Sequence, residues 1–410
     1  MARFDTDAQT LETLRLEGER SEYPAHLPPI PPLPAARYSD PDFYALELKH
    51  VFFKSWLAVG HVSELEKPGA YKLFEELGQS IIISRGIDNE IRAFRNACRH
   101  RAAAIVTEPK GVARRFVCPY HSWGYSTEGE LKSVPEPQNF ACLDKGKLGL
   151  HRVRCENWRG FLYINFDDDA ISLEEYMAPI AAIVQDFPFE DMTVKGTVVT
   201  DIACNWKTGY DNFLESYHIN TVHRKTIAPF IDTKTWTLEG LPHGHGCLRT
   251  MKRGGSQTLF RSENISDEGI AGKVSERYRA ITVAIPRFPN TTAGLDPAGF
   301  NWQSFWPTGP DTMRMVNLYL GPDLESPEAD RKYWDDFISY NDTILAEDMY
   351  LFPSMQRSMS EGDISHLMLS TQEHYIQWYH EHLDKAIGTQ NIPESLRVQQ
   401  VLSGEGTTGA

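Results

Sequence analysis

The hydrophobic pattern of the first half of the chain predicts short β-strands. Between Trp56 and Phe166 the apolar residues come in brief runs separated by turn-forming residues, a pattern typical of strands. These runs are GAYKLFEE, SIIISRG, IRAFRN, RRFVCP and GFLYINF. We therefore expect one all-β domain in this region.

A proline-rich stretch over residues 23–34 precedes these strands and predicts an extended arm. A short helix is expected after it, from Asp40 or Pro41 to about Phe53. Ser39 or Asp40 is its expected N-cap, because Ser and Asp are preferred at that position.

The pattern changes in the second half of the chain. A helical segment is predicted over residues 173–187 and a strand over residues 193–202. Alternating runs follow between residues 246 and 320, and the pattern then predicts helices over residues 326–359 and 372–383. This order predicts an α+β domain in which long helices cover an antiparallel sheet. The residues from about Ser403 predict a disordered tail.

Composition narrows the class of protein without naming a substrate. A chain of 410 residues is long enough for two domains. A net charge of −15, without runs of Lys and Arg, argues against nucleic acid or an anionic membrane as partner. No apolar stretch is long enough to span a bilayer, and the first residues lack a hydrophobic signal core. The irregular spacing of the other cysteines predicts no disulfide framework, so we expect a cytoplasmic protein.

Two short Cys/His pairs carry the first chemical signal. They are Cys98-x-His100 and Cys118-x-x-His121, and each follows an apolar run, so two neighbouring loops can meet at one metal centre. Two thiolates and two imidazoles are the ligand set of a Rieske [2Fe–2S] cluster. The alternative is a structural zinc site, but zinc motifs usually pair Cys with Cys and His with His. The mixed pairs therefore favour the cluster.

A second candidate metal site begins with His218 and His223. Residues five apart lie about 140° apart on an ideal helix, so the two imidazoles share an ion only if the helix ends or unwinds between them. The best carboxylate to complete the site is Asp348, because Pro353 disrupts the helix next to it and can turn that side chain inward. Two His and one carboxylate form the ligand set of non-haem Fe(II) oxygenases. The alternatives are structural histidines and a solvated acidic turn.

Together these motifs resemble the α subunit, the terminal oxygenase, of the Rieske non-haem iron aromatic-ring-hydroxylating oxygenases. The resemblance covers roughly residues 40–385 and includes both metal motifs in order. It also includes Asn205-Trp206-Lys207, Asp211-Asn212, and Glu347-Asp348 followed by Gln356.

The resemblance implies an N-terminal Rieske domain and a C-terminal helix-grip catalytic domain. The expected domains are an arm over 1–38, a Rieske domain over 39–170 whose first helix joins the catalytic domain, the catalytic domain over 171–390, and a tail over 391–410. Cys98 and Cys118 would hold one cluster iron, and His100 and His121 the other. His218, His223 and Asp348 would hold a mononuclear Fe(II), leaving positions for water, O2 and substrate.

The same resemblance implies a head-to-tail homotrimer, in which a carboxylate joins the cluster of one subunit to the iron of the next. Glu215 is the expected bridge, because it lies three residues before His218 on the same face of an expected helix. Asp211, seven residues before His218 on that face, is the second candidate, and Asn212 is grouped with them as a candidate catalytic residue. Two departures from the family pattern are Ala102, where glycine is common, and Glu215, where aspartate is common. Ala tolerates fewer backbone conformations than Gly, so a difference in that loop is expected.

The expected reaction uses O2 and electrons from NAD(P)H. No Gly-x-Gly-x-x-Gly fingerprint of a nicotinamide or flavin site is present, so a separate reductase, with or without a ferredoxin, is expected. The expected assembly is an α3 homotrimer or an α3β3 complex. The substrate is expected to be an aromatic or alicyclic small molecule that is hydroxylated or O-demethylated. Candidate pocket residues are Asn212, Phe213, Tyr217, Phe230, Phe300, Trp302, Phe305 and Trp306, each of which could equally be a core residue.

Three alternatives remain open at this stage. The first is oxidative N-demethylation of a quaternary ammonium compound such as carnitine or betaine, whose trimethylammonium group aromatic side chains could hold by cation–π attraction. The second is a stand-alone Rieske electron carrier. The third is a ligand-binding helix-grip module with structural zinc.

Overall fold

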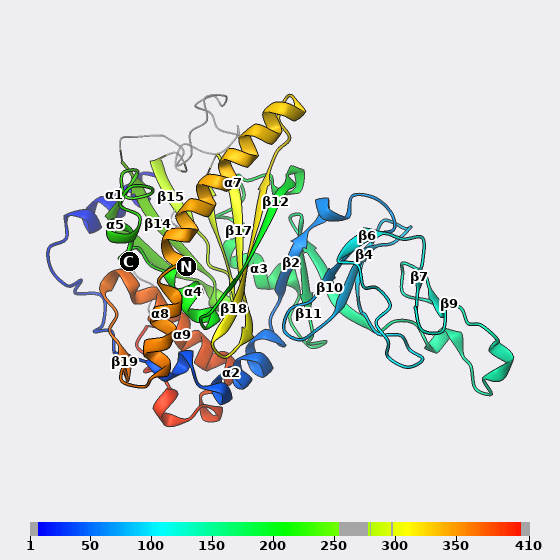
Figure 1. Cartoon of the computed structure of the whole chain (residues 1–410). Helices are drawn as coiled ribbons and strands as arrows, with labels where there is room; N and C mark the ends of the chain where they lie inside the picture. The colour runs from blue at the N-terminus through cyan, green and yellow to red at the C-terminus, as the bar shows by residue number, and fades with distance from the viewer. Residues whose placement is uncertain (1–6, 254–277, 279, 297, 403–410) are drawn as a thin grey trace. The chain divides into compact units, whose positions relative to one another are not determined.

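The computed structural model describes residues 7–253, 278, 280–296 and 298–402 (Figure 1), and the chain divides into two compact units. The smaller unit contains residues 53–176 and 189–193. The larger unit contains the described residues up to Phe52, residues 177–188, and those from Val194 onward. The chain passes from one unit to the other within α3 (Leu173–Ala181).

The smaller unit is built from β-strands, as the sequence predicted. One antiparallel sheet has the order β2-β11-β10-β5-β4-β3-β6. Its strands are β2 (Leu57–His61), β3 (Ala70–Phe74), β4 (Ile81–Arg85), β5 (Ile91–Arg95), β6 (Lys110–Val112), β10 (Arg152–Trp158) and β11 (Phe161–Asn165). A second sheet contains β7 (Phe116–Val117), β8 (Gly124–Tyr125) and β9 (Leu131–Ser133). Residues of both sheets, such as Phe94, Phe116 and Tyr125, share one buried core that also includes Cys98 and Cys118.

The larger unit is built on an antiparallel sheet with the order β12-β18-β17-β16-β15-β14-β13 among the described residues. Its strands are β12 (Thr193–Ile202), β13 (Ile231–Gly240), β14 (Gly246–Lys252), β15 (Ile281–Ala284), β16 (Thr291–Asp296), β17 (Gly299–Gly309) and β18 (Thr312–Gly321). Figure 1 shows α7 (Pro327–Met349) lying along one face of this sheet. The α+β fold class is confirmed.

Glycines in β17 and β18 let α7 approach the sheet. A Cβ atom at Gly299 or Gly321 would collide with the ring of Trp334, so these positions leave room for the helix. A second helix, the short α4 (Trp206–Asn212), packs on the same two strands, where Gly209 lies against Phe305 and Met313. Two helical segments therefore cover one sheet face, which is here called the helix-covered face.

The long C-terminal helical pattern is interrupted, as the proline predicted. α7 ends at Met349, and α8 (Phe352–Ser360) begins anew with Pro353 in its first turn, where a missing N–H costs nothing. Gln356 of α8 accepts a hydrogen bond from Asn205 N (2.7 Å) and donates one to Tyr38 O (2.9 Å). α8 is thereby fixed to the start of α4 and to the N-terminal segment.

The N-terminal segment is more structured than an arm. It contains α1 (Asp7–Glu19), which the sequence analysis did not predict, and α2 (Pro41–Glu47), whose N-cap is Asp40 as predicted. A π-helical turn (Leu48–Phe52) extends α2. Within the proline-rich stretch, β1 (Leu33–Pro34) pairs with β19 (His366–Leu367). The predicted disordered tail from Ser403 lies outside the described residues.

Candidate metal sites

The two candidate iron histidines stand at either end of one helical turn. α4 ends at Asn212, and α5 is the short turn Ile219–Val222. His218 precedes α5 and His223 follows it, where the backbone leaves the helical conformation (φ −96°, ψ 33°). The two rings therefore approach each other, with their centroids 5.1 Å apart. The expectation that the helix ends between them is confirmed.

Asp348 completes this group from the end of α7. Its carboxylate is buried, and Oδ1 lies 3.1 Å from His223 Nε2 and 3.7 Å from His218 Nε2. Ligand atoms of all three residues lie within 4.8 Å of one another, and theirs is the one such group among the residues that the structure describes. Neither carboxylate oxygen has a hydrogen-bond partner of good geometry. A buried carboxylate that faces two imidazole nitrogens is well suited to a divalent cation.

A carboxylate lies behind each imidazole. Glu215 Oε1 contacts His218 Nδ1, and Glu347 Oε2 lies 2.8 Å from His223 Nδ1. Glu347 also accepts a hydrogen bond of 2.5 Å from the Thr226 hydroxyl. With the Nδ1 atoms held in this way, both rings direct Nε2 toward Asp348. This is the usual carboxylate–histidine arrangement behind a metal ligand.

The charge balance of this site supports cation binding. Burial opposes a charged imidazole at His223, but the carboxylates of Asp348 and Glu347 outweigh it and raise the pKa of His223. The carboxylates of Glu215, Glu347 and Asp348 together carry more negative charge than the two imidazoles can balance. Two imidazole nitrogens and one carboxylate with open positions are suited to Fe(II).

The Cys/His motifs occupy two loops of the smaller unit that have the same form. In the first loop Ala102 N donates to Cys98 O (2.9 Å), and in the second Ser122 N donates to Cys118 O (3.0 Å). Ala102 (φ 58°) and Ser122 (φ 57°) both take the left-handed conformation. The first loop thus closes like the second although an alanine stands where glycine is favoured, so the expected difference in this loop is not seen.

The four side chains of these loops come together. Both thiols are buried, and the rings of His100 and His121 are 4.6 Å apart between centroids. His100 also stacks on Trp123 and has a buried Nδ1 without a partner. Burial raises the pKa of the Cys118 thiol, and the neighbouring Cys98 raises it further. Such a pair is stabilised by a metal centre that takes both thiolates.

The spacing of these side chains favours a cluster over one ion. No three of the four place ligand atoms within 4.8 Å of one another, so among the described residues they do not form a single-ion group. A tetrahedral zinc site would bring its ligand atoms closer than this. Two iron atoms, each held by one pair of side chains, require the wider arrangement.

Asp211 lies in a different environment from Glu215. Its Oδ2 accepts hydrogen bonds from the Tyr38 hydroxyl (2.5 Å) and from His380 Nε2 (3.2 Å). Among the described residues, Glu215 contacts the candidate iron ligand His218, whereas Asp211 contacts Tyr38 and His380. Asn212, at the end of α4, has a buried Nδ2 without a partner.

The candidate pocket residues separate onto two sides of β17. Phe305 lies on the helix-covered face, where its ring contacts Phe213 (5.3 Å between centroids). Phe300, Trp302 and Trp306 alternate with Phe305 and therefore point to the opposite face. These three side chains therefore lie on the face away from α4 and α7, and their place in a substrate pocket stays a prediction. Tyr217 and Phe230 are exposed on the surface.

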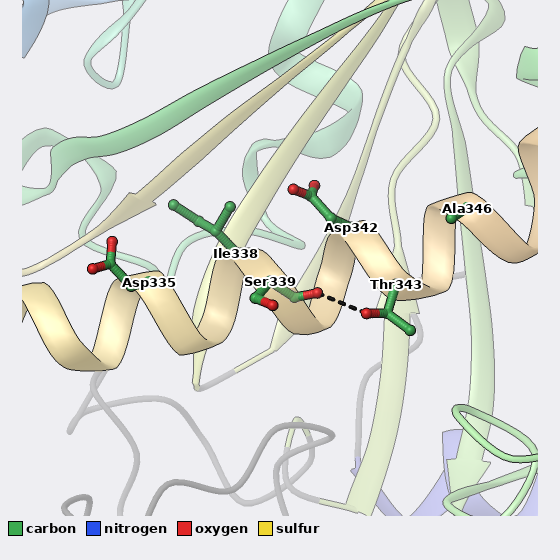
Figure 2. A pocket seen from close by; sticks show the side chains of 6 residues that line it. All are labelled: Asp335, Ile338, Ser339, Asp342, Thr343 and Ala346. Carbon is green, nitrogen blue, oxygen red and sulfur yellow. Dashed lines mark hydrogen bonds between the residues drawn. The ribbon is translucent and has the colours of Figure 1, made fainter.

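A hollow on the surface of the larger unit contains none of the candidate metal ligands. Figure 2 shows it along α7, lined by Asp335, Ile338, Ser339, Asp342, Thr343 and Ala346. It contains none of the sequence-predicted site residues, and Asp342 is engaged by the Tyr319 hydroxyl (3.2 Å). We do not assign it a role in catalysis.

Sequence reasoning missed the contact between Glu347 and His223. The only available signal was the Glu347-Asp348 pair, in which Asp348 was predicted to be an iron ligand and Glu347 was given no role. The contact joins residues 124 positions apart, so it depends on how α7 folds back over the segment after α5. The hydrogen bond from Thr226 to Glu347 was missed for the same reason.

Comparison with known proteins agrees with both halves of this description. Residues 55–152 match the family model of the Rieske [2Fe-2S] domain. Residues 189–389 match the model of the ring hydroxylating alpha subunit catalytic domain. The chain therefore contains a Rieske domain followed by a ring-hydroxylating oxygenase α-subunit catalytic domain. Its two domains are accordingly those that hold a Rieske [2Fe–2S] cluster and a mononuclear iron.

Individual members of this family differ in their substrates. The benzene 1,2-dioxygenase subunit alpha of Pseudomonas putida is 38% identical over 192 residues, covering 45% of this chain and 42% of that protein. The carnitine monooxygenase oxygenase subunit of Escherichia coli K12 is 35% identical over 193 residues, covering 47% and 52%. These alignments thus span about half of each relative's length.

Solved structures of the family share the fold over nearly the whole chain. A quaternary ammonium Rieske monooxygenase superposes with a TM-score of 0.75 at 22% identity, covering 90% of this chain and 99% of that one. The naphthalene 1,2-dioxygenase of Rhodococcus sp. bound to indole gives 0.72 at 21% identity, covering 97% and 99%. Among the described residues, no helix is long and apolar enough to cross a membrane.

Proposed function

We propose that this chain is the terminal oxygenase component of a multicomponent Rieske oxygenase. Its expected reaction is hydroxylation, by mono- or dioxygenation, or O-demethylation of an aromatic or alicyclic small molecule. The observation that carries this proposal is the convergence of His218, His223 and Asp348 in a chain that also has the Cys98/His100 and Cys118/His121 loops. An electron-transfer module alone does not need the first of these sites, and a ligand-binding module needs neither.

In this proposal each group of side chains has one task. The Cys98, Cys118, His100 and His121 side chains hold the cluster, and His218, His223 and Asp348 hold Fe(II). When bound, the iron activates O2 with electrons delivered through the cluster. Glu215 and Glu347 keep the two imidazoles in the orientation that directs Nε2 to the metal.

We further propose that Glu215 carries the electron path between subunits of a head-to-tail trimer. Glu215 touches His218, and the next side chain but one, Tyr217, is 61% exposed. On the smaller unit Tyr120, beside His121, is 54% exposed. Both candidate metal sites thus lie next to exposed aromatic side chains that a neighbouring subunit can cover.

Electrons from NAD(P)H are proposed to come from a separate reductase, with or without a ferredoxin, and the assembly to be α3 or α3β3. A cytoplasmic location suits a thiolate-bound cluster, and all six cysteines are free of disulfides. The second candidate activity is monooxygenation or N-demethylation of a quaternary ammonium compound. The likeness to the carnitine monooxygenase oxygenase subunit favours it.

The direct test is a substrate screen with purified, iron-loaded protein and a surrogate reductase. Product formation and uncoupled peroxide are scored separately for aromatic, alicyclic and quaternary ammonium compounds. We expect O2-dependent product from at least one class, and none from an Asp348→Ala variant. A protein that passes electrons to an external acceptor, but consumes no O2 with any compound, would instead be an electron carrier.

A further inference from the structure

Three polar side chains form a row across the sheet of the larger unit. Thr292 of β16 is the cross-strand partner of Gln303 of β17, and Gln303 is the partner of Asn317 of β18. Directly paired residues on neighbouring strands point to the same face, with their Cβ atoms about 5 Å apart. These three residues are here called the polar row.

The polar row points to the helix-covered face. Phe305, two residues beyond Gln303, contacts Phe213 just after α4. Tyr319, two residues beyond Asn317, donates a hydrogen bond to Asp342 of α7. The polar row therefore lies between the contacts of two segments, one leading to His218 and the other ending at Asp348.

The row is buried, and part of its hydrogen-bonding capacity is not used. Thr292, Gln303 and Asn317 are 2%, 6% and 1% exposed. Within the part of the chain that the structure describes, the Thr292 hydroxyl and the Asn317 Oδ1 have no partner, and neither does Oδ1 of Asn301, which lies on the same face two residues before Gln303. Buried polar groups in folded proteins nearly always have partners, so unpartnered ones are places where a bound water or a ligand group can be received.

The row offers hydrogen-bond donors and acceptors without charge. Amides and a hydroxyl both donate and accept, whereas a carboxylate ligand would call for a cation. Two lysines of the sheet on this face are already paired: Lys252 with Asp296 (3.0 Å), and Lys195 with Asp330 of α7 (2.9 Å). A trimethylammonium group has no N–H or O–H to donate, and a plain hydrocarbon has neither donors nor acceptors, so both would leave the row unpartnered.

We propose that the polar row binds a neutral carbonyl, carboxamide or hydroxyl group of the substrate. The row thereby selects a ring compound that bears such a group over an unsubstituted hydrocarbon or a quaternary ammonium compound. This inference rests on the proposed oxygenase function, because it places the substrate beside the candidate iron site.

The test compares four probes that share one benzene ring: benzamide, isopropylbenzene, benzoate and phenyltrimethylammonium. Their dissociation constants are measured by calorimetry on the iron-loaded protein under anaerobic conditions. We expect benzamide to bind at least about tenfold more tightly than isopropylbenzene, which has the same number and connectivity of heavy atoms but no polar group. Asn317→Leu and the isosteric Thr292→Val should reduce this preference to less than about threefold. Ser304→Ala, on the opposite face of β17, is the matched control and should preserve it.

Thermal unfolding of the same variants separates recognition from folding. Because Asn317 lacks a partner for its amide oxygen, Asn317→Leu should leave the melting temperature unchanged or raise it. Any increase should be seen only in protein without bound ligand. Equal binding of benzamide and isopropylbenzene, tightest binding of phenyltrimethylammonium, or no saturable benzamide binding overturns the inference.

The iron content distinguishes these failures from a failure of the proposed function. Protein that holds both metals and consumes O2, yet shows no preference for benzamide, disproves only the role of the polar row. Protein without mononuclear iron disproves the oxygenase proposal, and its probe binding still reports on the row.

Discussion

At the scale of single residues, the candidate iron site is defined by what lies behind its ligands. Glu215 and Glu347 each engage the Nδ1 atom of one histidine, so the direction of both Nε2 atoms is set before any metal arrives. Partners of this kind commonly change metal affinity or activity 10- to 100-fold when they are removed. The two glutamates are expected to differ in their effects, because only Glu215 is proposed to carry electrons.

Replacement of Glu347 should weaken metal binding. Glu347→Gln keeps the shape of the side chain but loses the charge that holds His223, so we expect iron affinity to fall about 10- to 100-fold with the cluster unaffected. Iron retention against a chelator measures this, with the Rieske electron-paramagnetic-resonance signal as the internal reference. Glu328→Gln, in the exposed first turn of α7, is the control. Unchanged iron retention in Glu347→Gln would show that the contact has no role in metal binding.

Replacement of Glu215 should separate electron transfer from metal binding. Glu215→Gln is expected to retain both metals while substrate-coupled turnover falls at least about tenfold. The decisive readout is single-turnover oxidation of the pre-reduced cluster in the presence of O2 and substrate. Comparison with Glu347→Gln, loaded with the same amount of iron, removes the contribution of ligand orientation. Full activity in Glu215→Gln would exclude it as the bridge.

The backbone of the first cluster loop carries an avoidable strain. Ala102 has a φ of 58°, a conformation that costs an L-residue about 1 kcal/mol and glycine almost nothing. Ala102→Gly should therefore stabilise the smaller unit by up to about 1 kcal/mol, measured as a higher melting temperature with the cluster bound. Ala103→Gly, at a neighbouring residue without a positive φ, should destabilise slightly instead. A lower stability of Ala102→Gly would contradict the strain argument.

At the scale of elements, the sequence predicted those whose signals are local. The cap at Asp40, the interruption near Pro353 and the end of the helix between His218 and His223 all depend on a few neighbouring residues. β17 shows where this reasoning stops. Its segment GFNWQSFWPTG is largely buried on both faces, so polar and apolar residues do not alternate clearly enough to show which aromatic side chains face the helices. Only the pairing with β16 and β18 resolves the two faces.

The N-terminal segment, α4 and α9 (His374–Ile387) meet in a buried network that no local pattern indicated. Arg37 donates to His380 Nδ1 (3.0 Å) and forms an ion pair with Asp384 (2.7 Å). His380 Nε2 in turn faces Asp211 (3.2 Å). Because Nδ1 accepts from an arginine, the imidazole is neutral with its proton on Nε2. Burial is the main reason that the pKa of His380 is lowered.

This network predicts a loss of stability in mild acid. Below the ordinary histidine pKa of 6.5 the unfolded chain gains a proton that the buried imidazole does not accept, so folding stability falls as the pH drops through that value. One such group changes the free energy of unfolding by at most about 1.4 kcal/mol per pH unit.

The corresponding test uses melting temperatures at pH 5 to 7. His380→Gln can still accept from Arg37 and donate to Asp211 but cannot titrate, so its melting temperature should fall less steeply with acid than that of the natural chain. His151→Gln, at an exposed position, should follow the natural chain. Parallel pH profiles for the natural chain and His380→Gln would contradict the assignment of a neutral, buried His380.

At the scale of the whole molecule, the order of motifs along the chain indicated more than any one of them. Cys98/His100, Cys118/His121 and His218/His223 predicted a cluster domain followed by a catalytic domain, and the two family matches agree in that order. The sheet order of the larger unit and the contact between Glu347 and His223 could not be read from the chain, because they depend on pairings between distant residues. The polar row also depends on such pairings, because strand register alone brings Thr292, Gln303 and Asn317 together.

The measurement that tests the account most directly is the metal and sulfide content of protein purified and reconstituted without oxygen. A cluster and a mononuclear iron in each chain require roughly three iron atoms and two acid-labile sulfides, with a Rieske electron-paramagnetic-resonance signal on reduction and loss of about one iron in Asp348→Ala. Two iron atoms per chain that are unaffected by Asp348→Ala, or zinc in place of iron, would contradict this assignment.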